Sequence, residues 1–392
     1  MSERRRIQIK LATAATEMAR EEIEKQLAFL SGSISGIAFT APDVIELDTE
    51  LEDTEQLCRE ARELAARIQR TLRTLRRKVA YRSTAVDGAT FVGVGQSWDG
   101  IDYEAPGLSV LSGTPLRLWE YFDRCFEQFG RRWRPTPLRA PTLIPTSVLA
   151  RCDYFRSFPH NVTFASHLPE EPTRIESFRA RHHSRDTLDD HALSDMVTPE
   201  ACLSPAVCYH AYYAHRDRTI GTDPIVLQMA GKCFRYESSN TRDLRRLWDF
   251  TMRELVFLGG KQEVLAERAK GMELFQEFLE SHRIAAEIRT ASDPFFIAPD
   301  AAAKTYFQIN ADTKYEVSML LPAAGRLAVG SFNYHGAFFG KAFNCRLPDD
   351  TPMHSVCFAW GIERWVYGFL QQHGADSARW PDVMRSAPEF EL

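Results

Sequence analysis

The stretch that decides the fold of this 392-residue chain runs from Lys232 to Phe257 and reads KCFRYESSNTRDLRRLWDFTMRELVF. A short alternating segment opens it, a polar turn rich in Ser, Asn, Thr and Asp follows, and a second alternating segment closes it. One face of this second segment, with period two, is apolar: Trp248, Phe250, Met252, Val256 and Leu258. Glu254 falls on the same face and requires a partner, because an unpaired buried carboxylate is costly.

Residues 244–258 also fit an amphipathic helix. Six side chains would then form one stripe: Leu244, Leu247, Trp248, Thr251, Leu255 and Leu258. Periodicity alone slightly favours this helix, so strand and helix both remain open at this point.

Composition describes an ordinary globular protein, with 44% hydrophobic and 26% charged residues and a net charge of −5. The chain is long enough for two domains, or for one large domain with an appendage. It contains no long uncharged apolar run that would predict a transmembrane helix, and the basic start MSERRRIQIK lacks the apolar core of a secretory signal. The eight cysteines are scattered without a disulfide framework, which favours a reducing, cytoplasmic location.

The first 88 residues predict a small α+β unit with the order strand, helix, two strands, helix. The strands are expected at Ile7–Leu11 and as a pair within Ile37–Leu47, and the helices at Thr16–Leu30 and Thr54–Val79. The apolar stripe of the second helix comprises Leu57, Leu64, Ile68, Leu72, Leu75 and Val79.

The second half of this second helix is strongly basic. It carries Arg62, Arg67, Arg70, Arg73, Arg76, Arg77 and Lys78 against the single acid Glu63. Such a run is either a solvated helix face or a docking surface for a polyanion, which would be RNA or an acidic protein.

The remaining 304 residues, 89–392, are expected to form the main domain. Residues 87–113 look like a glycine-rich linker or loop that enters the main domain. Leu116–Phe129 is an amphipathic helix, and Thr142–Ile144 reads as an edge strand that ends at Pro145. The charged segment 169–195 predicts a surface loop or short helix.

Three segments resemble the motifs of class II aminoacyl-tRNA synthetases. Motif 2 is similar to Phe234-Arg235-x-Glu237, the basic loop and Asp249-Phe250-x-x-x-Glu254. Motif 3 is similar to Gly361-Ile362-Glu363-Arg364. Motif 1 is loosely similar to the helix and strand that end at Pro145. The resemblance implies an α+β fold, an antiparallel sheet flanked by helices. It decides for the strand over the helix at 244–258, since motif 2 consists of two antiparallel strands that hold ATP. Motif 1 implies a homodimer.

Further segments resemble one branch of this class, the carrier-protein ligases and the archaeal seryl-tRNA synthetases. They are Asp293–Phe296, Lys314–Val317 and Ser331–His335. Both groups hold a catalytic zinc ion with Cys, Glu and Cys. Here the resemblance assigns these ligands to Cys208, Glu254 and Cys357, which supplies the partner that Glu254 requires.

The assigned ligand set is typical of catalytic zinc, because two thiolates and one carboxylate leave a fourth tetrahedral position open. In the family the amino group of the substrate takes this position. A free amine lone pair is needed there, so the site would select α-amino acids over hydroxy and acyl analogues and would direct the carboxylate toward ATP.

The resemblance also implies the ATP contacts. It assigns Arg235 to the α-phosphate, Glu237 to the amino edge of adenine, Phe250 to stacking on the base and Arg364 to the terminal phosphates. One of Arg242, Arg245 and Arg246, with Arg246 preferred, would hold the pyrophosphate. Glu316 and Ser331 are candidates for Mg²⁺.

The sequence therefore predicts an enzyme that activates a small amino acid with ATP to the aminoacyl-adenylate. It would then transfer the aminoacyl group to the phosphopantetheine thiol of a carrier protein. The alternative is a seryl-type synthetase that transfers the amino acid to tRNA. A regulatory relative without activity is the third possibility, which the retained arginines and zinc ligands disfavour.

Overall fold

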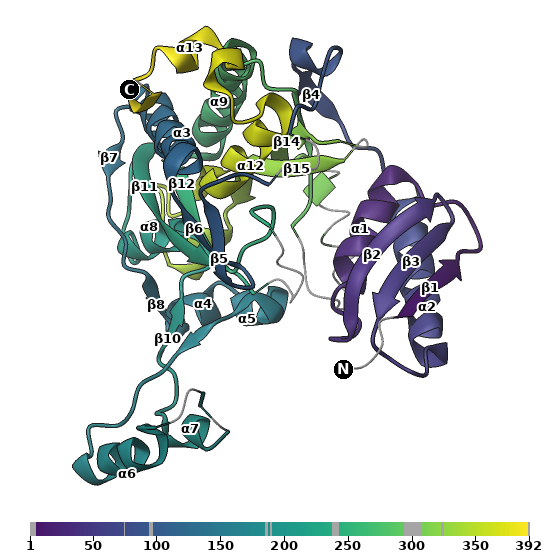
Figure 1. Ribbon diagram of the computed structural model, residues 1–392. Helices are drawn as coiled ribbons and strands as arrows, with labels where there is room; N and C mark the ends of the chain where they lie inside the picture. The colour runs from purple at the N-terminus through teal and green to yellow at the C-terminus, as the bar shows by residue number, and fades with distance from the viewer. Residues whose placement is uncertain are drawn as a thin grey trace.

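The computed structural model describes residues 5–73, 75–93, 97–184, 187–188, 190–236, 243–293, 304, 308–309, 311–322 and 325–390. The N-terminal unit is a three-stranded antiparallel sheet of order β1-β3-β2, against which two helices pack (Figure 1). Its elements are β1 (Arg5–Lys10), α1 (Glu17–Leu27), β2 (Ile34–Ala41), β3 (Val44–Thr49) and α2 (Glu55–Leu72). The predicted element order is confirmed.

The second predicted helix is too long at its C-terminal end. Leu72 and Leu75 are buried as expected, but α2 ends at Leu72. Val79 begins a strand, β4 (Val79–Arg82), and is 53% exposed. Since β4 pairs with β13 of the large sheet, its backbone hydrogen bonds come from the main domain rather than from a continued helix.

The main domain is built on an eight-stranded sheet of order β4-β13-β14-β15-β16-β12-β11-β7 (Figure 1). All its pairs are antiparallel except β11 with β7. The strands after β4 are β7 (Thr136–Pro137), β11 (Ile225–Phe234), β12 (Asp249–Gly259), β13 (Ala286–Thr290), β14 (Lys314–Leu320), β15 (Arg326–Gly336) and β16 (His354–Gly361). A mixed fold with a large, mostly antiparallel sheet is thereby confirmed.

Hydrophobic cores lie on both faces of this sheet. One core packs the long helices α3 (Gly113–Arg131), α9 (Lys261–Ser281) and α12 (Ile362–His373) against it. The other core packs the short helices α4 (Thr146–Arg151), α8 (Cys208–Ala214) and α11 (Phe338–Ala342) against the opposite face. Successive side chains of each strand therefore point alternately into the two cores.

The segment 244–258, whose periodicity fits both a strand and a helix, is a strand, β12, from Asp249 onward. β12 pairs with β11 on one side and with β16 on the other, so its backbone is hydrogen-bonded along both edges. A helix over 244–258 is wrong, because its hydrogen bonds would be local and would leave β11 and β16 unpaired. The turn residues 243–247 precede β12 and bury Leu244 and Leu247 in the core on the long-helix face.

Smaller elements complete the chain. The region expected to be a linker contains a hairpin, β5 (Ile101–Ala105) with β6 (Leu108–Leu111), so that expectation is wrong over its second half. A three-stranded sheet joins β8 (Leu143–Pro145), β10 (Ala201–Leu203) and β9 (Phe164–Ala165); β8 is an edge strand that ends at Pro145, as predicted. The remaining helices are η1 (Thr84–Val86), α5 (Tyr154–Ser157), η2 (Pro159–Asn161), α6 (Pro172–His182), α7 (Asp190–Asp195), η3 (Ser377–Arg379), α13 (Asp382–Arg385) and η4 (Pro388–Phe390).

The charged segment 169–195 forms α6 and α7, which extend from the body of the molecule at the lower left of Figure 1. Of the helices that the structure describes, none combines the length and apolar character needed to cross a membrane.

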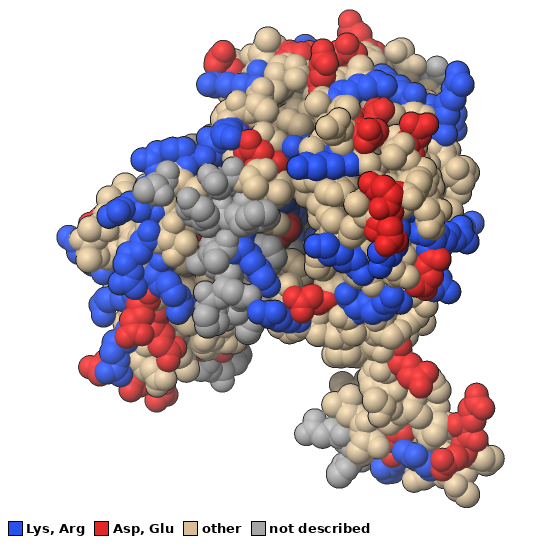
Figure 2. All heavy atoms as spheres, turned by 180° about the vertical axis from the view of Figure 1, so that it is seen from behind, with Lys and Arg blue, Asp and Glu red and all other residues tan. Residues whose placement is uncertain are grey.

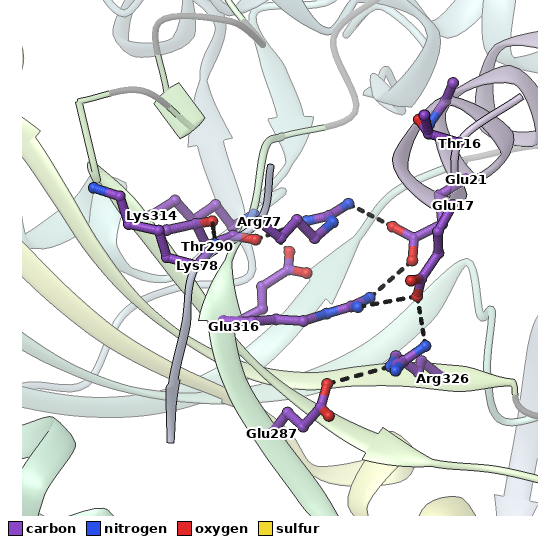
Figure 3. A network of polar contacts seen from close by, with 12 residues as sticks. Thr16, Glu17, Glu21, Arg77, Lys78, Glu287, Thr290, Lys314, Glu316 and Arg326 are labelled. Atoms are coloured by element: carbon purple, nitrogen blue, oxygen red, sulfur yellow. Dashed lines mark hydrogen bonds and ion pairs between the residues drawn. The ribbon is translucent and has the colours of Figure 1, made fainter. Parts of the chain in front are cut away.

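Ion pairs hold the N-terminal unit against the edge of the large sheet (Figure 3). Arg289 of β13 is only 6% exposed, and its guanidinium lies 2.8 Å from Glu21 and 3.4 Å from Glu17 of α1. Arg77 also pairs with Glu21 and donates a 2.7 Å hydrogen bond to the Thr290 carbonyl. Two carboxylates of one helix thus compensate guanidinium groups that burial would otherwise penalise.

Replacing Glu21 by Ala should loosen this contact, because Arg289 and Arg77 would both lose a carboxylate partner. We expect the free energy of unfolding in urea to fall by roughly 2 kcal/mol, with faster proteolysis between residues 72 and 79. The control Glu63→Ala removes an exposed acid of α2 and should change stability by less than about 0.5 kcal/mol. Equal effects of both substitutions would contradict a role for Glu21 in the contact.

Candidate metal and nucleotide site

Strand register places three of the predicted site residues, Glu254, Ser331 and Glu316, in one line across the sheet. Glu254 of β12 lies opposite Ala359 of β16, Ala359 opposite Ser331 of β15, and Ser331 opposite Glu316 of β14. Residues directly opposite each other share a face, so these four side chains form a cross-strand row. Three interstrand spacings separate Glu316 from Glu254, which corresponds to about 14 Å.

The three predicted zinc ligands meet at one end of this cross-strand row. The ligand atoms of Cys208, Glu254 and Cys357 all lie within 4.8 Å of one another. α8 supplies Cys208, β12 supplies Glu254 and β16 supplies Cys357, and the Cys357 sulfur lies 3.4 Å from Glu254 Oε2. Glu254 is 1% exposed, so its carboxylate depends on these thiols and on the nearby Arg235.

Burial makes this trio unfavourable as a set of charged groups. It raises the pKa of the Glu254 carboxyl and raises the pKa of the Cys357 thiol well above its usual value. For Cys208 the thiol of Cys357 acts in the opposite direction, but burial still leaves the pKa raised. A divalent cation reverses such shifts, because it stabilises thiolate and carboxylate ligands directly.

The donor set fits Zn²⁺. Two thiols and one carboxyl are ligands that zinc prefers, and three protein ligands leave one position for a substrate atom. The other six cysteines are also free thiols. Within the described part of the chain, no other group of three or more His, Cys, Asp or Glu side chains lies close enough together to bind a metal ion.

A cavity of about 110 Å³ lies beside the trio on the same face of the sheet. Met252 and Ala359 line it and are two residues from Glu254 and Cys357 along their strands, a step of about 7 Å. Its lining comprises Arg235, Leu244, Leu247, Phe250, Met252, Lys314, Glu316, Ala328–Ser331, Ala359, Gly361, Glu363 and Arg364. Five predicted nucleotide residues therefore meet at one cavity: Arg235, Phe250, Glu316, Ser331 and Arg364.

Arg235 directly follows β11, lines the cavity and lies near the metal trio. Its Nε donates to the Pro205 carbonyl at 2.9 Å, and its guanidinium lies 5.5 Å from the centre of the Phe250 ring. The carbonyl contact fixes the orientation of the fork while the arginine still lines the cavity.

Arg364 enters the cavity from the first turn of α12. Its Nε donates to the Arg245 carbonyl at 2.8 Å and its Nη1 to the Ala328 carbonyl at 3.1 Å. The neighbouring Glu363 is buried and accepts hydrogen bonds from the Thr251 amide and the Trp119 indole. Glu363 thus joins α12 to β12 and α3, which positions Arg364.

Sequence reasoning assigned no role to Lys314, which the structure places in the cavity beside Glu316. Its ammonium lies 3.0 Å from Glu316 and 2.6 Å from Asp293. Burial would raise the pKa of Asp293, but Lys314 and the Gln308 hydrogen bond lower it to about 2. Lys314 lies two residues before Glu316 on β14, and this period-two spacing was the available signal.

Not all of the residues predicted to contact ATP line the cavity. Arg246 lies in the turn before β12 and does not line the cavity, so its pyrophosphate contact stays a prediction. The Arg245 guanidinium lies over the ring of Tyr367, at 5.5 Å. Glu237 and Arg242 lie outside the described residues.

The metal trio predicts about one Zn²⁺ per chain. Replacing Cys357 by Ala should remove most of this zinc, measured by elemental analysis of the purified protein, because two ligands hold Zn²⁺ far more weakly than three. The control Cys202→Ala changes a thiol that is equally buried but lies outside the trio, and it should retain the metal. Retention of a full equivalent by the Cys357 variant would refute the assignment.

Comparison with known proteins agrees with this geometry. Residues 192–373 match the model of the tRNA synthetase class II core domain (G, H, P, S and T). Amino acid–[acyl-carrier-protein] ligase 2 of Bradyrhizobium diazoefficiens is 30% identical over 300 residues, which cover 73% of this chain and 87% of that protein. The type-2 serine–tRNA ligase of Methanopyrus kandleri is 24% identical over 296 residues, 71% of this chain and 56% of that protein.

The chain spans about half the length of the type-2 serine–tRNA ligases that it matches. The fold likeness is broader. M. kandleri SerRS, in a crystal structure with A. aeolicus tRNASec, matches 99% of this chain and 77% of its own chain with a TM-score of 0.64 at 20% identity. The chain thus has the class II synthetase core and belongs to the amino acid–[acyl-carrier-protein] ligase family, whose homologues include the type-2 serine–tRNA ligases.

Proposed function

We propose that this protein activates a small amino acid with ATP and transfers it to the phosphopantetheine thiol of a carrier protein. The observation that carries the proposal is the cross-strand row, which joins the metal trio to the arginine-lined cavity on one face of one sheet. The Bradyrhizobium diazoefficiens relative, of which this chain covers 87%, is named as an amino acid–[acyl-carrier-protein] ligase. That name supports a carrier protein as the acceptor.

Both half-reactions balance with the proposed substrates. The carboxylate of the amino acid attacks the α-phosphorus of ATP, and pyrophosphate leaves. The thiol of the carrier then attacks the carbonyl carbon of the adenylate, and AMP leaves as the thioester forms. Negative charge develops on phosphate oxygens in the first step, so fixed cationic groups near the α-phosphate stabilise its transition state.

The residues of the chain divide this work by position. Cys208, Glu254 and Cys357 would hold Zn²⁺, which would supply a Lewis acid for the amino group of the substrate. Arg235 lines the cavity near the trio and binds the carboxylate and the α-phosphate, which aligns the attack. Arg364 binds the terminal phosphates, and Phe250 packs against the base.

Magnesium is assigned to the opposite end of the row. Glu316 and Ser331 offer a carboxylate and a hydroxyl on adjacent strands, which are ligand types that Mg²⁺ accepts. Lys314 already contacts Glu316, so it contributes a fixed positive charge at the same place. We infer that ion and ammonium together neutralise the phosphates. The homodimer and the cytoplasmic location remain predictions.

The alternative acceptor is tRNA. It is favoured by the fold likeness to the M. kandleri synthetase, which extends over the N-terminal unit. Both enzyme functions share the first half-reaction and differ only in the molecule that attacks the adenylate.

ATP–pyrophosphate exchange that depends on an amino acid should be detected with glycine, alanine or serine, since the activation step is reversible. Labelled amino acid is then offered in parallel to holo-carrier protein and to total tRNA, and label is expected on the carrier thiol. No exchange with any amino acid would overturn both enzyme functions, whereas label on tRNA alone would select the alternative.

Arg235→Ala and Arg364→Ala should each lower the exchange rate about 100-fold or more, because each removes a cationic group that faces the phosphates. Arg385→Ala serves as the control, since this exposed arginine of α13 pairs only locally with Asp382. Exchange at the unmodified rate in either cavity variant would exclude that arginine from the reaction.

A further inference from the structure

The N-terminal unit carries a basic surface that the proposed chemistry does not use. Arg59, Arg62, Arg70 and Arg73 project from one face of α2, since their spacing brings them within a quarter turn of one another at 100° per residue. This face lies opposite the buried stripe, and all four side chains are exposed. We call these four residues the α2 arginine face.

Among the residues that the structure describes, none of the four pairs with a carboxylate, although Glu60 and Glu63 lie on the same helix. Figure 2 shows Lys and Arg side chains over the N-terminal unit, with Asp and Glu gathered at its lower end. The face from Arg59 to Arg73 extends for about 21 Å, the length of a short helix.

The segment that follows α2 contacts β13, the strand next to β14, which carries the cavity residues Lys314 and Glu316. Arg77 hydrogen-bonds to Thr290, which lies opposite Tyr315 on β14, and Tyr315 stands between the cavity residues Lys314 and Glu316. Burial would raise the pKa of Glu316, but Lys314 together with Lys25 and Arg77 of the N-terminal side lowers it. A partner bound along α2 would therefore end close to β13, one strand away from the cavity residues of β14.

We propose that the α2 arginine face docks an acidic helix of the carrier protein and directs its thiol-bearing arm into the cavity. This inference rests on the proposed function, because it names the surface that receives the acceptor. Charge complementarity selects the partner, since exposed guanidinium groups along one helix face match carboxylates along another.

The charge of the whole unit favours an acidic protein over RNA. Residues 5–78 contain thirteen Lys and Arg against thirteen Asp and Glu, a net charge of zero. Domains that bind nucleic acid are usually strongly basic throughout. In the described part of this unit before residue 79, no large hydrophobic side chain is exposed, so no exposed aromatic platform for stacking bases is present there. A basic face on a nearly neutral unit fits a protein partner that presents an acidic face of similar size.

The test is the double variant Arg62→Glu/Arg70→Glu in the full chain, with purified holo-acyl carrier protein as the acceptor. The KM for the carrier should rise roughly tenfold or more, and added salt should raise the KM of the unmodified enzyme. Amino-acid-dependent pyrophosphate exchange and kcat at saturating carrier should stay unchanged, because neither arginine lines the cavity. The matched control Arg5→Glu/Lys10→Glu makes the same charge change on β1 and should leave the carrier KM unchanged.

The outcomes separate this inference from the proposed function. Transfer to the carrier with an unchanged KM in the α2 variant refutes the docking surface and leaves the proposed function intact. No transfer to carrier by the unmodified enzyme, with exchange present, removes the proposed function. Transfer to tRNA with a KM that rises in the α2 variant replaces the acidic protein by RNA. Equal thermal unfolding of both double variants confirms that the exposed substitutions leave the fold unchanged.

Discussion

The buried carboxylate of Glu254 constrains everything around it. β12 lies between β11 and β16, so Glu254 cannot turn toward water without disrupting two strand pairings. A carboxylate in this position is costly unless it is compensated. The thiols of Cys208 and Cys357 approach it from a helix and from the neighbouring strand, and together the three side chains offer a metal ion the ligands it requires. The face of the sheet that carries Glu254 is consequently the face on which we propose that the chemistry takes place.

Sheet register then sets the distances between the groups that bind the substrates. The cross-strand row carries the metal trio at one end and Glu316 at the other, with small side chains, Ser331 and Ala359, between them. Small residues leave room above the strands for a ligand, whereas the opposite face is filled by Phe257, Phe358 and Trp360. A rigid, doubly packed sheet is suited to this task because its side chains move little relative to one another.

The N-terminal unit is connected to the same row. Arg289 lies opposite Glu316, which extends the row by one strand to the ion pairs with α1. Charges of the N-terminal side therefore influence Glu316, and the contact between the two parts belongs to the environment of the cavity. A unit that serves only as a spacer would not require charged groups so close to a residue that lines the cavity.

The sequence by itself predicted residues that the structure brings together at the metal trio and the cavity, and it predicted the element order of the N-terminal unit. The Cys, Glu and Cys ligands, Arg235, Phe250 and Arg364 were all recognisable from local motifs, because each motif keeps its residues close along the chain. The helices of the N-terminal unit followed from their apolar stripes, which depend only on local periodicity. The position of Glu254 on an apolar face already indicated that it required a partner.

Only the tertiary structure decided what local patterns leave open. Residues 244–258 suit a strand and a helix almost equally, and pairing with β11 and β16 selected the strand. The end of α2 and the strand at Val79 depended on β13, more than two hundred residues away along the chain. The place of Lys314 beside Glu316 and Asp293, and the cross-strand row itself, follow from strand register. Register is set by contacts between distant segments, and no single segment contains that information.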